Sequence, residues 1–255
     1  MLAAAIALGV VAVLLAWPAP IAFSHASWPS RAPATALVLW QLIALAGAAA
    51  IIGALGLLGL ALLPVHPIAG GIAFGAGIGF VLHLLGHLAA TAYSVARQRH
   101  RHRTLLDLLS SPHPTEARTL VIDDGAPVAY CLPDGIGSLT VLSRGLMERL
   151  KADELAAVIA HERAHVEQRH DLLLLAFRAW RSALPWFPIA ARAEQEVAVL
   201  VELLADDRAR RSADDLVLAR AIVAVAGHRG EDLLAAVEER ADSRRAADRV
   251  RRLVA

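Results

Sequence analysis

Long runs of apolar residues dominate the first part of the chain. Three of these runs cover Leu2–Phe23, Thr35–Leu63 and Ile68–Ala96. The short connection Pro64–Pro67 separates the second run from the third. A transmembrane helix needs about 20 mostly apolar residues to cross the hydrocarbon core of a bilayer. We therefore expect residues 1–96 to form a transmembrane region of about three helices.

The first run has a second interpretation, as a signal peptide that is cleaved from the mature protein. It lacks the Lys or Arg that such a signal carries at its start, its apolar stretch is long, and further apolar runs follow it. We therefore expect a retained membrane span whose N-terminus lies outside the cell.

Beyond residue 103 the pattern changes to the short runs of a folded domain. Alternating or β-branched runs bounded by Gly- and Pro-containing turns lie at Arg118–Ile122, Val128–Leu132 and Ser138–Leu142. Runs of this kind predict a small antiparallel sheet with tight turns.

Helical patterns surround this sheet and continue after it. We expect helices at Thr104–Ser110, Ser143–Leu150, Asp153–Asp171, Glu194–Arg211 and Asp214–Gly227. The tail from Glu231 is densely charged and predicts a solvated helix. The expected fold is an α-helical membrane protein with an α+β domain, divided into a transmembrane region (1–96), a mostly helical cytoplasmic domain (97–227) and a charged tail (228–255).

The composition supports a membrane protein. Hydrophobic residues make up 57% of the chain, and the mean hydropathy is +0.52, whereas an ordinary soluble domain is roughly 45–50% apolar. The net charge of +1 identifies no partner. The single cysteine, Cys131, excludes an intrachain disulfide, which agrees with a reducing cytoplasm.

The distribution of arginine predicts the orientation of the spans. Four arginines lie within Arg97–Arg103, directly after the third apolar run, whereas the Pro64–Pro67 connection has none. Positive residues accumulate on the cytoplasmic side of membrane proteins. We expect an integral protein of the bacterial cell membrane in which residue 97 onward is cytoplasmic. The basic segment is expected to contact anionic lipid, and no direct binding of nucleic acid is expected.

The strongest chemical signal is the sequence HERAH at residues 161–165, within a predicted helix. Positions i and i+4 of a helix lie one turn apart on the same face. His161 and His165 can therefore present two imidazoles to one metal ion, with Glu162 beside it as a general base.

A second predicted helix carries the element ELLAD at residues 202–206. Glu202 supplies the carboxylate that completes a three-ligand zinc site with an open fourth position. Asp206 lies one turn beyond Glu202 and can orient a ligand imidazole through a hydrogen bond. Together the two elements predict a site for one zinc ion in a metallopeptidase.

A chance H-E-x-x-H sequence on a solvated helix face is the alternative. Here the polar residues interrupt the apolar stretch ELAAVIAHERAHV, where uncompensated polarity would cost free energy, and the second element follows in another apolar helix. We therefore favour the metal site. Arg163 departs from the usual pattern, because many such helices carry an uncharged residue at that position.

These residue types predict metal-assisted hydrolysis of peptide bonds. Zinc would activate a water molecule and polarise the scissile carbonyl, and Glu162 would transfer the water proton to the leaving amine. The sequence does not identify the group that stabilises the developing oxyanion. Tyr130, Arg210 and Arg211 are weak candidates.

The stretch Leu172–Ala191 is long enough for a fourth span, but charge interrupts it. Arg178 and Arg181 lie in its middle, and each costs roughly 2.5–3.5 kcal/mol at a bilayer centre. A crossing would also separate the two metal-binding helices by a membrane thickness. We expect a pair of amphipathic helices at the membrane surface, with Trp180, Trp186 and Phe187 at the interface.

The sequence around these motifs resembles the gluzincin domain of integral-membrane peptidases. Four segments carry the resemblance, V-I-D, P-V-A-Y-C-L-P, L-T-V-L-S-R-G-L and D-E-L-A-A-V-I-A-H-E-R-A-H. The pieces HERAHVEQRHD, PWFP and ELLADD are most similar to the BlaR/MecR-type antirepressor peptidases. The motifs span Ala96–Arg211, and the N-terminal part is similar in layout.

This resemblance implies a zinc endopeptidase that cleaves a cytoplasmic, repressor-like protein. It also implies that the strand at Ser138–Leu142 binds the substrate as an added edge strand. We expect no β-lactam sensor, because the chain ends at Ala255. HtpX-type quality-control peptidases and CAAX-prenyl proteases carry the same kind of zinc-binding motif and are the near alternatives.

Two alternatives belong to other classes of protein. One is a non-catalytic membrane sensor with a structural zinc site, but such a site needs no general base and Glu162 is intact. The other is a metal transporter that would use His83 and His87, one turn apart in the third apolar run. Three spans are few for a transporter, and histidines hydrogen-bonded between helices explain this pair equally well.

Overall fold

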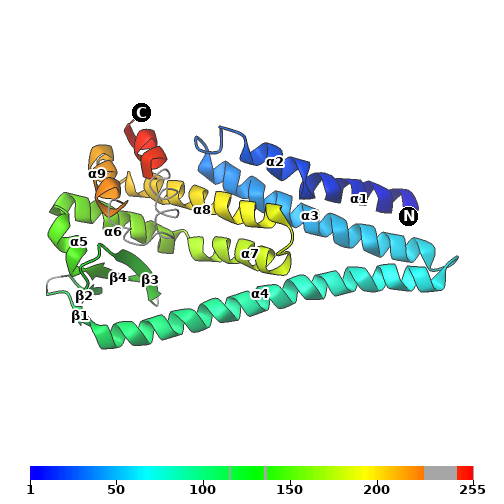
Figure 1. The fold of residues 1–255 in the computed structure, drawn as a ribbon, viewed down its shortest axis with the longest axis horizontal. Helices are drawn as coiled ribbons and strands as arrows, with labels where there is room; N and C mark the ends of the chain where they lie inside the picture. The colour runs from blue at the N-terminus through cyan, green and yellow to red at the C-terminus, as the bar shows by residue number, and fades with distance from the viewer. Residues whose placement is uncertain (115, 135–136, 227–245, 255) are drawn as a thin grey trace. The chain divides into compact units, whose positions relative to one another are not determined.

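The chain forms two compact units, whose helices and strands are labelled in Figure 1. The computed structural model describes residues 1–114, 116–134, 137–226 and 246–254. The first unit comprises Met1–Ala96 and Leu172–Leu200. The second unit comprises Arg97–Asp171 and Val201–Ala255.

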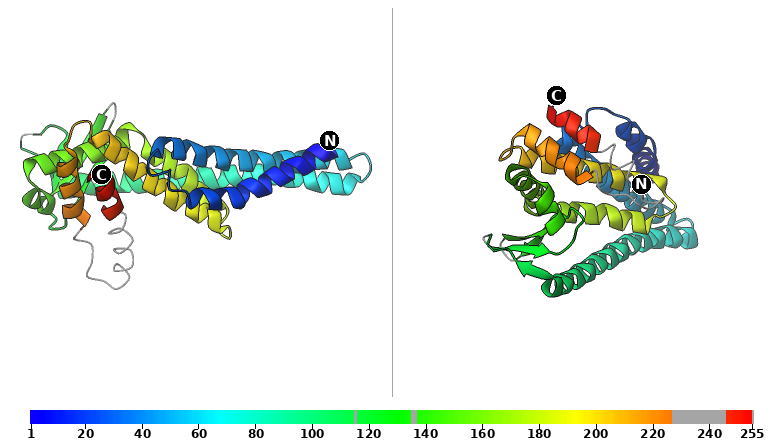
Figure 2. Two further views of the ribbon diagram at one scale, coloured as in Figure 1. Left: turned by 90° about the horizontal axis from the view of Figure 1, so that it is seen from above. Right: turned by 60° about the vertical axis from the view of Figure 1, so that its left-hand side comes forward.

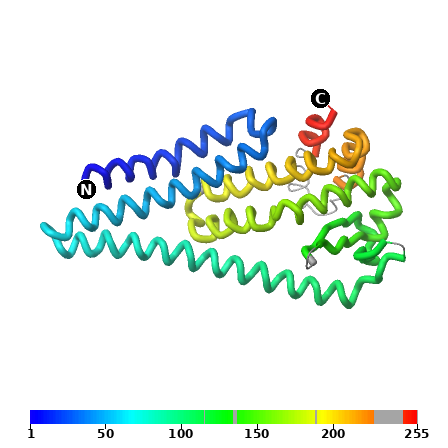
Figure 3. Tube along the Cα trace, turned by 180° about the vertical axis from the view of Figure 1, so that it is seen from behind, coloured from blue at the N-terminus to red at the C-terminus, as the bar shows by residue number. Residues whose placement is uncertain are grey.

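The first unit contains the apolar helices. In chain order these are α1 (Leu2–Ala16), α2 (Pro18–Ser24), α3 (Pro33–Leu62) and α4 (Pro67–Leu109). Three helical stretches of the described residues are long and apolar enough to cross a membrane, namely Leu2–Ser24, Pro33–Leu62 and Pro67–Leu109. The expected number of helices suited to cross a membrane is therefore found. Helix α1 lies alongside α3, and the first part of α4 runs back antiparallel to α3 (Figures 1 and 3).

Glycine allows α3 and α4 to approach closely beside the turn that connects them. A Cβ atom on Gly59 would lie 2.7 Å from the backbone nitrogen of Phe74, and one on Gly70 would lie 2.5 Å from the backbone nitrogen of Leu63. Any larger residue at either position would push the two helices apart. Glycine at these two positions therefore permits the close approach of the two helices.

Helix α4 is a single helix of 43 residues, although the sequence predicts a separate helix at Thr104–Ser110. No proline or glycine lies between Gly86 and Leu109, so nothing interrupts the helical hydrogen bonds, and the basic segment Arg97–Arg103 is helical. The helix ends shortly before Pro112, because the residue that precedes a proline disfavours helical backbone.

Helices α7 (His170–Ala183) and α8 (Pro188–Ala209) form a hairpin connected by residues 184–187 (Figure 3). Neither is among the helices of the described residues that could cross a membrane. Arg178 and Arg181 of α7 pair with Glu194 of α8 at 3.7 and 3.1 Å. The charges within the expected surface helices are thus accommodated between them. Their placement at the membrane surface stays a prediction.

His83 and His87 of α4 contact the end of α7. His83 Nε2 donates to the backbone oxygen of Ala183 at 2.9 Å, and His87 Nδ1 lies 2.8 Å from Ser182 Oγ. Both histidines therefore have hydrogen-bond partners on another helix. This agrees with the interhelical alternative, and the metal-ligand group found among the described residues does not include them.

The second unit contains a four-stranded sheet of order β1-β2-β4-β3. Its strands are β1 (Ser110–Pro112), β2 (Thr119–Ile122), β3 (Ala129–Asp134) and β4 (Gly137–Ser143). Pairs β1–β2 and β3–β4 are antiparallel, whereas β2 and β4 run parallel, with Thr119 opposite Thr140. The sheet is therefore mixed, which corrects the expected antiparallel sheet. The parallel pair arises because β4 inserts between β2 and β3.

Helices α5 (Arg144–Arg149), α6 (Ala152–Glu167) and α9 (Asp215–Ala226) belong to the same unit, and residues 246–254 form a further helical segment (Figure 2). The core between them is built from Ala157, Ala209, Leu218, Ile222 and Leu253. The expected solvated tail lies partly outside the described residues. Its last part is helical but packed, because Leu253 is only 5% exposed.

Candidate metal centre

Helix α6 carries the HERAH sequence, and local chemistry defines both of its ends. At its start the Lys151 amide donates to the Glu154 carboxylate at 3.0 Å, as in a capping box. After its end Arg169 adopts a φ of 51°, so the chain leaves the helix and α7 begins at the next residue. Arg163 is exposed, and its unusual charge therefore points to solvent.

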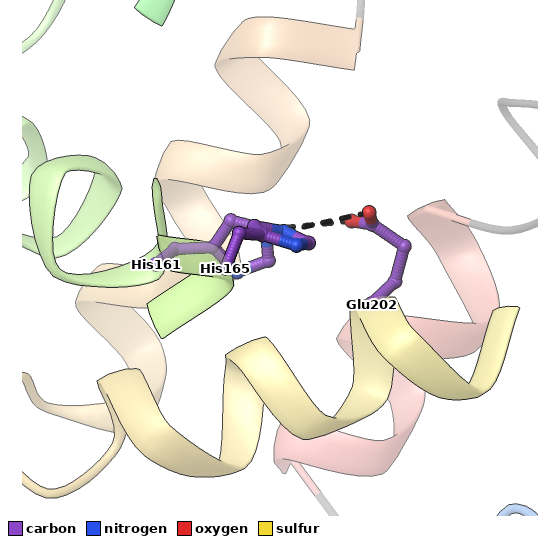
Figure 4. A group of neighbouring side chains, drawn as sticks. All are labelled: His161, His165 and Glu202. Carbon is purple, nitrogen blue, oxygen red and sulfur yellow. Dashed lines mark hydrogen bonds and ion pairs between the residues drawn. The ribbon is translucent and has the colours of Figure 1, made fainter. Parts of the chain in front are cut away.

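The structure brings His161, His165 and Glu202 together, the histidines from α6 and the carboxylate from α8 (Figure 4). The Nε2 atoms of the two histidines are 3.2 Å apart. Oxygens of Glu202 lie 3.3 Å from His161 Nε2 and 3.6 Å from His165 Nε2. The Glu202 side chain is 41% exposed, so the group is accessible from solvent.

The spacing of these three ligand atoms fits a zinc ion. Zinc bonds of about 2.0–2.2 Å in a tetrahedron place neighbouring ligand atoms roughly 3.3–3.6 Å apart, close to the distances in the structure. Two imidazoles and one carboxylate are also the donor set of catalytic zinc sites that keep a fourth position open. No other group of this kind occurs among the residues that the structure describes.

Asp206 orients His161. Its Oδ1 lies 2.9 Å from His161 Nδ1, and its side chain is only 1% exposed. When His161 is neutral with its proton on Nδ1, that proton is donated to Asp206 and the lone pair of Nε2 faces Glu202. Glu202 and Asp206, one turn apart on α8, thus contact the same histidine.

His165 has a partner that the sequence does not reveal directly. His170 Nδ1 lies 2.9 Å from His165 Nδ1, and His170 Nε2 lies 3.0 Å from Gln168 Oε1. Because an amide oxygen can only accept, His170 carries its proton on Nε2 and accepts at Nδ1. His165 therefore donates from Nδ1 and keeps its lone pair on Nε2, toward Glu202. The only signal in the sequence is a histidine five residues after His165.

Arg249, from residues 246–254, is the second residue that sequence reasoning missed. Its guanidinium donates to both oxygens of Asp206, from Nε at 2.7 Å and from Nη2 at 2.6 Å. Its Nη1 lies 3.1 Å from Glu202 Oε2. Arginine is frequent throughout the charged tail, so the sequence does not indicate which one lies beside the candidate ligands.

The two histidines titrate in opposite directions. Burial by itself lowers the pKa of His161, but hydrogen bonds to Asp206 and Glu202 outweigh burial and raise this pKa to about 9. Burial prevails at His165 and lowers its pKa to about 4, although the charge of Glu202 opposes this. At neutral pH His161 is therefore protonated, whereas His165 is neutral.

The two glutamates also differ. Burial raises the pKa of Glu162 to about 7, and the negative charge of Glu202 acts in the same direction. Burial alone would also raise the pKa of Glu202, but the hydrogen bond and charge of His161 and the charge of Arg249 lower it to about 2. Glu202 is thus ionised at neutral pH, whereas Glu162 can both accept and release a proton.

The three oxyanion candidates from the sequence are engaged elsewhere or exposed. The Tyr130 hydroxyl is 2.8 Å from His102 Nε2. Tyr130 and its neighbour Cys131 lie on opposite faces of the sheet. Arg210 donates to Asp215 at 2.7 and 2.6 Å. Arg211 is exposed. The structure therefore supports none of these three as a catalytic group.

The edge strand beside α6 is β3. The strand expected to bind substrate, Ser138–Leu142, lies in β4, which is paired with β2 on one side and with β3 on the other. It has no free edge, so this expectation is wrong. Strand β3 packs against α6, and in the described part of the chain only one of its sides is paired.

Comparisons with known proteins agree with the position of the candidate site. The model of peptidase family M48 matches residues 95–223, just over half of the chain. The matched segment includes His161, Glu162, His165, Glu202 and Asp206, and it ends before the C-terminal helical segment. No solved structure matches the chain.

Proposed function

The chain belongs to peptidase family M48, and we propose that it is a membrane-bound zinc endopeptidase with one zinc ion per chain. We assign His161, His165 and Glu202 as the zinc ligands and Glu162 as the general base. One observation carries this proposal, namely that both imidazoles are held at Nδ1 so that their Nε2 atoms converge with a carboxylate at 3.2–3.6 Å.

The residues of this centre have separate tasks in peptide hydrolysis. A zinc ion, when bound, supplies a Lewis acid that polarises the scissile carbonyl and acidifies a nearby water molecule. Glu162 accepts a proton from the attacking water and delivers it to the leaving amine, a task suited to a pKa near 7. Asp206 and His170 keep the two imidazoles oriented.

We propose that substrate binds along β3. An extended peptide can add to an exposed strand edge through backbone hydrogen bonds, and β3 lies beside the helix that carries Glu162. An extended substrate on this edge would have its scissile bond near the metal centre. Because the bonds involve only the backbone, the strand edge itself favours unfolded or flexible segments of many sequences.

Regulatory cleavage of a cytoplasmic repressor-like protein is the activity that we favour, on the resemblance of HERAHVEQRHD, PWFP and ELLADD to antirepressor peptidases. Quality control of membrane proteins, as in HtpX-type peptidases, is the alternative within the same chemistry. A non-catalytic membrane sensor with a structural zinc site is the alternative of another class. The presence of Glu162 beside the candidate ligands argues against the sensor, because a structural zinc site needs no general base.

We also propose an orientation, with the N-terminus outside and the zinc domain (97–227) and charged tail (228–255) in the cytoplasm. The arginines at 97–103 support it. Reporters fused after Arg103 and at Ala255 should both report a cytoplasmic position, and one in the connection 64–67 an external one. Reporters after Arg103 and at Ala255 on opposite sides would show that residues 172–191 cross the membrane.

The test of function is cleavage by the purified full-length protein in detergent, with zinc content measured in parallel. Substrates should include a repressor encoded beside this gene, an unfolded membrane protein and casein. Cleavage of the repressor alone supports the regulatory role, and broad cleavage supports quality control. A protein that binds zinc but cleaves none of the three, with no difference from Glu162→Gln, supports the sensor.

A further inference from the structure

Arg249 is placed to join the two carboxylates that contact His161. All three guanidinium nitrogens are engaged, Nε and Nη2 with Asp206 at 2.7 and 2.6 Å and Nη1 with Glu202 at 3.1 Å. The Arg249 side chain is 17% exposed and that of Asp206 only 1%, so the pair between them is shielded from water, whereas Glu202 is open to solvent on one side. Bidentate arginine–carboxylate pairs combine strength with a fixed geometry.

The contacts of Arg249 act on the candidate ligands along two paths. Through Asp206 it fixes the carboxylate that accepts the proton of His161 Nδ1, and so the direction of the imidazole. Through Glu202 it restrains the ligand carboxylate itself. A carboxylate has about four lone-pair positions, so the guanidinium at Oε2 leaves Glu202 with free positions for a metal ion.

Charge balance also favours a site in which Arg249 lies beside a metal ion over a site in which Arg249 takes the place of the metal ion. Glu162, Glu202 and Asp206 bring up to three negative charges into a largely buried site, where they repel one another. Arg249 compensates one of them and leaves up to two, which matches a divalent cation. Without Arg249, Asp206 and Glu202 would keep only their histidine contacts, and neither carboxylate would be held in one orientation by a guanidinium.

The segment that carries Arg249 is held in place by other residues. Arg252 donates to Asp207 at 2.7 Å and to the backbone oxygen of Leu203 at 3.5 Å, both on α8. Leu253 packs in the core with Leu218. The segment should therefore remain docked when the Arg249 guanidinium alone is removed.

We propose that Arg249 is a positioning residue of the metal centre, which locks Asp206 and Glu202 into the geometry that binds the metal. This inference rests on the proposed function. It also extends the functional unit beyond the matched family segment, since the C-terminal helical segment would complete a site built on α6 and α8.

The test compares full-length Arg249→Ala and Arg249→Lys with the wild type and with Arg251→Ala as the matched control. Arg251 lies in the same segment, is 77% exposed and pairs with Asp248. Zinc affinity is measured by competition with a chelator, the ligand geometry by the visible spectrum of the Co²⁺-loaded protein, and the fold by thermal unfolding. Activity is not needed for any of these readouts.

We expect Arg249→Ala to weaken zinc binding by roughly 10–100-fold and to change the Co²⁺ spectrum, as for other residues that support metal ligands. Arg249→Lys should recover only part of the affinity, because an ammonium group cannot bind two carboxylates with a planar fork. Arg251→Ala should behave as the wild type.

Zinc affinity and a Co²⁺ spectrum of wild-type character in folded Arg249→Ala would overturn the proposal. If Arg249→Ala does not fold, Arg249→Lys decides, and wild-type affinity in that variant overturns the proposal equally. A wild-type protein that binds no zinc would instead contradict the proposed function. The two failures are therefore distinguishable.

Discussion

The two sides of the metal centre hold their histidines by different chemistry. On one side Asp206 and Arg249 surround His161 with a charged network, and the pKa of His161 is about 9. On the other side His170 contacts His165 through a neutral hydrogen bond, and the pKa of His165 is about 4. Hydrogen bonds to Asp206 and Glu202 thus raise the pKa of one histidine, whereas burial lowers the pKa of the other. Proton binding competes with metal binding on the charged side alone.

The largest effect is expected on the rate of proteolysis, from a variant at Glu162 that removes none of the groups holding the two histidines. Glu162→Gln should keep zinc and fold but reduce the rate of proteolysis by about 10²–10⁴-fold or more, because an amide cannot accept the proton of water. Glu167→Gln, on the exposed side of the same helix, is the matched control. An unchanged rate in Glu162→Gln with zinc bound would mean that the peptide bond is cleaved without this residue.

The pH dependence of zinc affinity tests the difference between the histidines. A raised pKa means that His161 holds its proton below pH 9, so zinc must displace that proton, whereas His165 is already neutral above pH 4. Zinc affinity should fall about tenfold per pH unit below pH 9 and be constant above it. We expect zinc to release about one proton at pH 7, by calorimetry in buffers of different ionisation enthalpy.

This titration is best made in Glu162→Gln, because the pKa of Glu162 near 7 would add a second proton to the count. Zinc affinity independent of pH between 6 and 9 would show that the charged side does not hold a proton. Release of two protons at pH 7 would show that the two histidines are alike. Either result would show that His161 and His165 do not differ in protonation as expected.

Removing the charge of Asp206 should weaken the charged side. Asp206→Asn keeps the size of the side chain but makes both the imidazole and the Arg249 contacts weaker, so zinc affinity should fall by roughly 10–100-fold. Asp215→Asn is the control, since Asp215 pairs with Arg210 on a partly exposed surface and contacts none of the candidate ligands. Equal zinc affinities in both variants would remove Asp206 from the account.

The smallest effect is expected on the neutral side. His170→Phe keeps an aromatic ring but removes the acceptor at Nδ1, and zinc affinity should fall by about tenfold, the lower end for residues that orient a ligand. Exposed His100 offers the control variant His100→Phe. A loss larger than that of Asp206→Asn would show that the neutral side contributes more, and the comparison would have to be reversed.

Much of this architecture follows from periodicity in the sequence. Apolar runs of about 20 or more residues predict the three spans, because a helix needs a stretch of this length to cross the hydrocarbon core of a bilayer. The four-residue spacing of His161 and His165, and that of Glu202 and Asp206, places each pair on one face of a helix. Such regularities are local, so one sequence is enough to see them.

The missed features depend on turns and contacts that no periodic pattern encodes. The parallel pairing of β2 with β4 follows from the insertion of β4 beside β3, which no single strand pattern encodes. His170 reaches His165 only because the chain bends at Arg169 with its φ of 51°. Arg249 lies in a tail whose composition is that of a solvated helix, and its burial depends on the docking of Leu253.

Whether α6 provides the zinc ligands is decided by the zinc content of the purified full-length protein, measured in the wild type and in the double variant His161→Ala/His165→Ala. We expect about one zinc ion per wild-type chain. We expect none in the double variant, with thermal unfolding showing that this variant is still folded. Stoichiometric zinc in the folded double variant would contradict the account, because the metal would then be bound by residues other than those of α6.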